Sequence, residues 1–213
     1  MLADNSLIRR FDQHQSRFHE LDFLFEILTI LVSSFLFNII PFAGPSNLLI
    51  ASNAAVLASV EPYIVGIMVA TGSATAKFIH YLVMFFLGKH ISKERRKRLD
   101  ENSAEIKRWA MPALFIVAAT PLPDEPVVIP LGLLKYNPGK LFLAYFAGKL
   151  LIGVVGAYLG IYAHQMFGSL ISNEVYIILS IVATIIITIV FLKVDIRKLA
   201  ERILKRKIEV IPS

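Results

Sequence analysis

The chain has 213 residues, of which 56% are hydrophobic and 18% are charged, and it contains no cysteine. Soluble domains carry about a quarter charged residues, so this composition predicts an integral membrane protein. The absence of cysteine excludes disulfides, thiol catalysis and cysteine-ligated metal sites. The net charge of +6 comes from basic residues between the apolar segments. That distribution is typical of membrane topology and argues against nucleic-acid binding.

The first apolar stretch, residues 27–60, is too long for a single membrane helix. It contains no charge over 34 residues, where one span needs about 20. Pro41 and Pro45 interrupt it, and proline ends a helix because it lacks an N–H group. We predict a crossing helix over residues 24–40 and a re-entrant segment over residues 41–60.

A second proline-broken segment follows at residues 111–136. Four prolines and two adjacent carboxylates lie at its centre: Pro121, Pro123, Asp124, Glu125, Pro126 and Pro130. At membrane depth, broken backbone and charge are tolerated only when buried in protein or lining a wet cavity. The segment is therefore a candidate substrate site, as in the discontinuous helices of transporters. Further crossing helices are predicted at residues 63–87, 140–166 and 175–192.

Basic residues predict the orientation. They concentrate in residues 1–23, 89–108 and 193–207, and the positive-inside rule places all three segments, including both termini, in the cytoplasm. The chain then reads as an all-α integral membrane protein of the plasma or inner membrane, with no signal peptide. Residues 1–23 form a cytoplasmic or interfacial segment, and residues 195–213 form a basic tail. The membrane domain, residues 24–194, is an inverted repeat of two re-entrant hairpins plus about four transmembrane helices.

Each predicted half contains a long helix rich in small residues that carries one isolated lysine, Lys77 or Lys149. Small residues allow close helix packing. The lysines either snorkel to an interface or neutralise Asp124 and Glu125 inside the protein. His80 lies one turn from Lys77, where it either relays protons or makes a packing hydrogen bond.

The remaining polar candidates have a capping alternative. Asp124 either caps a short helix or lines the pathway, and Ser46 and Asn47 either cap another helix or help to bind an anionic phosphate. Asn38 lies in the same uncharged stretch, residues 27–60, three residues before Pro41. No His, Asp or Glu group has metal-ligand spacing and no nucleophile motif is present. We therefore expect no metal, no cofactor and no enzymatic activity.

Several motifs in this order resemble the DedA/VTT superfamily, also called SNARE-associated Golgi proteins. The matching segments within residues 24–165 are Phe37-Asn38-Ile39-Ile40-Pro41, Pro45-Ser46-Asn47, Gly72 through Lys77 to Tyr81, Gly88-Lys89, Thr120 to Gly132 and Gly148-Lys149. The resemblance implies a membrane lipid transporter. The departures are Phe37 and Asn47 for the family's first-hairpin acids, Lys77 for an aspartate, and Thr120 and Pro126 for two arginines. The expected proton-coupled mechanism depends on those family residues.

Three functions follow from this sequence. The first is a scramblase or flippase that moves a phospholipid or polyprenyl-phosphate headgroup between leaflets. The second is an ion- or proton-coupled transporter of small solutes, and the third is a non-transporting membrane scaffold. The expected partners are membrane lipids, and the sequence leaves open whether the chain forms a homo-oligomer.

Overall fold

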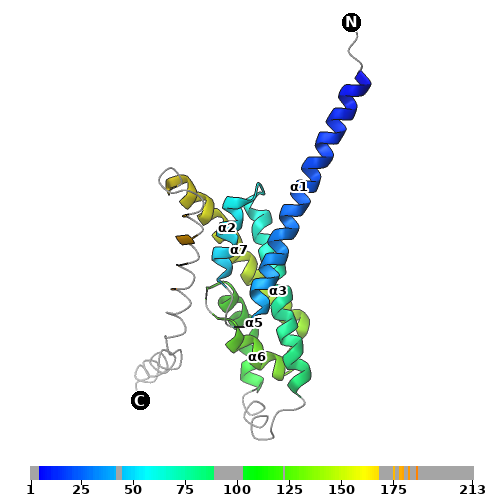
Figure 1. Ribbon diagram of the computed structural model, residues 1–213. Coiled ribbons are helices and arrows are strands. Elements are labelled where there is room, and N and C mark those ends of the chain that lie inside the picture. The colour runs from blue at the N-terminus through cyan, green and yellow to red at the C-terminus, as the bar shows by residue number, and fades with distance from the viewer. Residues whose placement is uncertain are drawn as a thin grey trace.

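The computed structural model describes residues 5–41, 45–88, 103–121 and 123–167, with five single positions between 175 and 186. Over these residues all regular structure is helical (Figure 1). The helices are α1 (Asn5–Ile39), α2 (Asn47–Leu57), α3 (Pro62–Leu87), α5 (Ser103–Ala118), α6 (Glu125–Leu133) and α7 (Pro138–Phe167). In the described part of the chain, three segments are long and apolar enough to cross a membrane: Arg17–Ile39, α3 and α7. The prediction of an all-α membrane protein is confirmed at this level.

The α1 helix runs parallel to α3 and ends near its middle. The Ser34 hydroxyl donates to the Val69 carbonyl at 2.8 Å, and the Ser73 hydroxyl donates to Asn38 Oδ1 at 3.2 Å. Both pairs are 35 residues apart in the chain, and the same offset places α1 position 27 beside the start of α3. Earlier residues of α1 extend beyond the bundle (Figure 1). The crossing helix predicted at residues 24–40 thus reaches only the middle of α3.

In the second half of the chain, the end of α5 packs against α7. The backbone of Gly148, in α7, lies against Phe115, Ala118 and Ala119 at the end of α5. Since Gly148 is the eleventh of the 30 residues of α7, α5 also ends well inside the length of its long neighbour. The α5 helix already begins at Ser103, so residues 103–108, the end of the basic segment, and the first arm of the second broken segment lie on one helix.

The short helix of each half packs on the long helix of the other half. A Cβ atom added to Gly132, in α6, would come within 2.7 Å of Met84 Cβ in α3. Added to Gly156 or Gly160, in α7, it would come within 2.5 Å of the Leu48 or Ser52 carbonyl oxygen in α2. Only glycine permits such close approach of two helix backbones. These contacts lock the two halves together.

Two of the prolines that were predicted to interrupt helices at the hairpins lie inside a helix instead. Pro41 and Pro45 lie between α1 and α2, and Pro121 and Pro123 lie between α5 and α6. In contrast, Pro126 and Pro130 lie within α6. Pro126 is tolerated because the first helical N–H groups have no intrahelical acceptor. Pro130 sits one turn further on, where it removes one hydrogen bond from a nine-residue helix.

Some predictions fall outside the described residues. They concern the loop at 89–102, most of the span predicted at 175–192, and the basic tail at 195–213. Of the predicted span, Val175, Ile178, Leu179, Val182 and Ile186 are described, and all five are helical and exposed.

Candidate functional site

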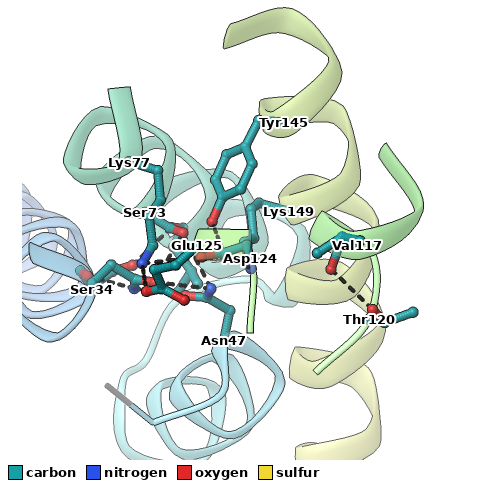
Figure 2. A network of polar contacts seen from close by, with 12 residues as sticks. Ser34, Asn47, Ser73, Lys77, Val117, Thr120, Asp124, Glu125, Tyr145 and Lys149 are labelled. Carbon is teal, nitrogen blue, oxygen red and sulfur yellow. Dashed lines mark hydrogen bonds and ion pairs between the residues drawn. The ribbon is translucent and has the colours of Figure 1, made fainter. Parts of the chain in front are cut away.

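Four charged side chains meet in the interior of the protein, and we call them the charge cluster: Lys77, Asp124, Glu125 and Lys149 (Figure 2). Lys77 Nζ lies 2.5 Å from Glu125 Oε1 and 3.1 Å from Asp124 Oδ1. Lys149 Nζ lies 3.1 Å from Asp124 Oδ2. Each residue is at most 4% exposed. The predicted pairing of the lysines with the acids is confirmed, and the snorkelling interpretation is wrong for both lysines.

The fold brings these groups together from three elements. Lys77 comes from the middle of α3 and Lys149 from the first half of α7, while the two acids stand at the start of α6. The Asp124 carbonyl accepts the Val127 and Val128 N–H groups, but the Asp124 side chain makes no capping hydrogen bond. The positive end of the α6 dipole nevertheless favours carboxylates at this position. Side-chain capping therefore does not explain Asp124.

Charge balance explains how this cluster exists in an apolar interior. Burying an isolated charge costs several kcal/mol, and an opposite charge with good hydrogen-bond geometry offsets that cost. Two lysines and two carboxylates sum to zero net charge. Asp124 contacts both lysines, so it bridges the long helices α3 and α7. Removing any one member leaves the cluster with an uncompensated charge.

Tyr145 is a member of the site that the sequence reading did not find. It is 1% exposed, and its hydroxyl donates a hydrogen bond to Asp124 Oδ2. Lys149 Nζ lies 5.1 Å from the centre of the Tyr145 ring, which is cation–π range. Tyr145 and Lys149 are four residues apart on α7, and residues at this spacing share a helix face. That spacing was the available sequence signal.

A second polar group, the amide cluster, adjoins the charge cluster: Ser34, Asn38, Asn47 and Ser73. Asn38 Nδ2 donates to Asn47 Oδ1 at 2.9 Å, and Asn47 Nδ2 donates to Ser73 Oγ at 3.2 Å. The Ser73 side chain also lies close to the Tyr145 hydroxyl. Ser73 lies four residues before Lys77 on α3. A polar network therefore extends from the end of α1 to the start of α6.

Two further predicted residues lie at the edge of this network. Ser46 precedes α2 without capping it through its side chain, and its buried hydroxyl has no hydrogen-bond partner among the described residues. The capping interpretation is therefore wrong for Ser46, and the Asn47 amide is used in the amide cluster. His80 Nε2 donates to the Ile39 carbonyl at 2.8 Å. It thereby ties α3 to the end of α1, as expected of a packing histidine.

In the described part of the chain, no group of three or more His, Cys, Asp or Glu residues is arranged to hold a metal ion. The long apolar helices and the buried charge cluster define an all-α membrane protein with a charged interior site. The family model of the VTT domain matches residues 40–162, which is more than half of the chain and includes all four members of the charge cluster. The chain therefore belongs to the DedA/VTT family, as the motifs indicated. No curated protein and no solved structure shows significant similarity to it.

Proposed function

We propose that this protein moves the headgroup of a phospholipid between membrane leaflets. The observation that carries this proposal is the buried, charge-balanced cluster at the start of α6, where the second broken segment meets α3 and α7. Charged groups at membrane depth are rare and mark substrate pathways. Membership of a membrane family associated with lipid-related transport supports the same function.

The membrane arrangement we propose has two re-entrant hairpins that enter from opposite sides. The C-terminal part of α1 with α2 forms one, and α5 with α6 forms the other; α3 and α7 cross the whole membrane. The matching packing of the two halves supports an inverted repeat, since each short helix lies on the other half's long helix. The hairpin tips then lie near the midplane, where such transporters bind substrate.

This arrangement revises the expected orientation of the N-terminus. Because α1 is parallel to α3 and position 27 lies beside Pro62, the earlier residues of α1 belong on the side where α3 begins. The central loop at residues 89–102 follows the other end of α3. We therefore propose that the N-terminal segment and this basic loop lie on opposite sides, with the loop in the cytoplasm.

Single cysteines test this orientation in the otherwise cysteine-free chain. We expect an impermeant maleimide to label Ser6→Cys in intact cells and to leave Ser103→Cys unlabelled. Permeabilised cells should label both variants, which controls for reactivity. Protection of both positions in intact cells would restore the orientation in which all basic segments face the cytoplasm.

The charge cluster supports a zwitterionic substrate over a singly charged one. Its net charge is zero, so a phosphate can take the place of a carboxylate beside Lys149 while an ammonium group faces the freed acid. A headgroup that carries both charges leaves the total unchanged. A polyprenyl phosphate adds negative charge without compensation, which is costly in a low-dielectric interior.

The test is exchange of fluorescent phospholipid between leaflets of vesicles that contain the purified protein. Asp124→Asn and Glu125→Gln each remove one charge and keep the side-chain shape. A charge-assisted contact contributes about 1.5–3 kcal/mol, so we expect exchange to fall roughly 10- to 100-fold. Glu61→Gln, at an exposed acid before α3, should exchange lipid at the wild-type rate. Wild-type exchange in both cluster variants would refute the transport proposal.

The same contacts also favour one alternative, a non-transporting scaffold. Lys77 and Lys149 are both paired within the protein, which is what a purely structural lock between α3 and α7 requires. A scaffold predicts no lipid exchange above that of empty vesicles by the wild-type protein. The exchange assay therefore separates the two functions before any variant is made.

A further inference from the structure

A cavity of about 480 Å³ lies between α1 and α2, away from the charge cluster. Its walls are mainly apolar, with Phe25, Ile30 and Phe37 from α1 and Leu49 and Ile50 from α2. The volume falls in the range of small-molecule sites, roughly 300–1,000 Å³. We call this cavity the α1–α2 groove.

The groove has a direction relative to the rest of the fold. Its lining on α1 runs from Phe25 to Phe37, about 18 Å along the helix at 1.5 Å per residue. One end lies at the level where α3 begins, because the Ser59 N–H donates to Glu26 Oε2 at 3.1 Å. The other end, at Phe37 and Pro45, adjoins Asn38 and Ser46. The groove thus leads from a membrane surface toward the midplane.

Among the described residues of this lining, Glu26 is the one that carries a charge. It is half-buried, and the Ser59 backbone N–H is its partner within the described part of the chain. No lysine or arginine of that part neutralises it, in contrast to the two acids of the charge cluster. A carboxylate at the mouth of an apolar groove is complementary to a cationic group with an apolar chain behind it.

We propose that the α1–α2 groove binds a membrane lipid whose headgroup carries an ammonium group. The ammonium faces Glu26, and an acyl chain follows the apolar walls toward Phe37. Exposed apolar residues Leu28, Val32 and Leu36 on the same helix place this part of α1 next to lipid. The proposal rests on the proposed function for its membrane location and identifies an entry site for the transported lipid.

Native mass spectrometry of the full chain in detergent tests the proposal, with equal amounts of phosphatidylethanolamine and phosphatidylglycerol added. We expect the wild-type protein to retain the ethanolamine lipid in preference to the glycerol lipid, by about tenfold for one charge-assisted contact. Glu26→Gln should remove most of this preference. Glu61→Gln should keep it, because Glu61 is not part of the groove lining.

A second pair of variants tests the place of the acyl chain. Thr29 lines the groove, and its hydroxyl donates a hydrogen bond within its own helix, to the Phe25 carbonyl, so Thr29→Phe fills space without removing a tertiary hydrogen bond. We expect it to lower the bound-lipid fraction at least about tenfold. Val32→Phe adds a ring at an exposed position of the same helix that is not part of the lining and should not.

Three results would overturn the proposal. They are a lipid preference unchanged by Glu26→Gln, equal lipid binding by the two phenylalanine variants, or a dimer mass that Thr29→Phe alone abolishes. The last result would assign the groove to a second copy of the chain. Binding is measured here without transport, so a protein that binds the lipid but fails the exchange assay would refute the proposed function and leave this site intact.

Discussion

Replacement of Lys77 by methionine gives the most direct test of the charge cluster. Lys77 is 4% exposed and pairs with Glu125 at 2.5 Å and with Asp124 at 3.1 Å. Without it, one lysine faces two carboxylates, so the buried cluster carries one uncompensated negative charge. Breaking a buried ion pair from one side costs about 3–5 kcal/mol. We expect Lys77→Met to lower the unfolding free energy by that amount.

The double variant distinguishes the effect of an uncompensated charge from the effect of lost side-chain packing. Lys77→Met with Glu125→Gln leaves Asp124 opposite Lys149, so the cluster is neutral again. Partners in contact show coupling energies of about 0.5–3 kcal/mol, and we expect the second change to recover stability in that range. The measurement is denaturant unfolding of the purified protein in detergent, followed by circular dichroism.

Lys140→Met is the matched control, because Lys140 lies exposed in the first turn of α7. It should change stability by less than about 0.5 kcal/mol. The reasoning is refuted if Lys77→Met and Glu125→Gln are additive within about 0.5 kcal/mol. Equal losses in Lys77→Met and Lys140→Met would refute it as well.

Two further predictions concern helix contact and the tyrosine. A Cβ atom on Gly72 would lie 2.4 Å from the Leu31 carbonyl oxygen, whereas a Cβ atom on Gly139 would have its nearest neighbour 3.5 Å away. Gly72→Ala should therefore destabilise the protein by about 1–3 kcal/mol. Comparable thermal stability of Gly72→Ala and Gly139→Ala would contradict this. Tyr145→Phe removes one hydrogen bond to the Asp124 carboxylate and should lower the unfolding free energy by about 1.5–3 kcal/mol. The loss should be smaller when Tyr145→Phe is made in the Asp124→Asn variant, where this hydrogen bond is already weakened.

The charge cluster was predictable because the free-energy cost of burying a charged side chain depends on the residue type, which the sequence shows directly. Any lysine or carboxylate in an uncharged apolar stretch demands a partner, and the chain offers few of them. Sequence alone gave no means to assign the pairs, since Lys77 lies 48 residues from Glu125. Tyr145 was not predicted because an aromatic residue in an apolar helix most often packs in the hydrophobic core, so its residue type did not point to a polar site.

The depth reached by α1 was not predictable from composition. Residues Arg17–Ile39 are as apolar as a full crossing helix, so hydropathy cannot tell a crossing from one arm of a hairpin. The contacts Ser34–Val69 and Asn38–Ser73 place the end of α1 beside the middle of α3, and these contacts are tertiary. Likewise, Pro130 lies inside α6 although proline usually interrupts helices, because α6 is short and its packing against neighbouring helices stabilises it.

The order of the charge cluster along the chain has a consequence for biosynthesis. Lys77 leaves the ribosome 48 residues ahead of Glu125, which is roughly 2–10 s at 5–20 residues per second. During that interval α3 contains a lysine without its acids, and a lysine at the centre of a membrane helix costs about 2.5–3.5 kcal/mol on insertion. Until α6 is synthesised, only the favourable insertion of the apolar residues of α3 offsets this unfavourable free energy. The second half of the chain therefore supplies the carboxylates that neutralise the lysine of the first.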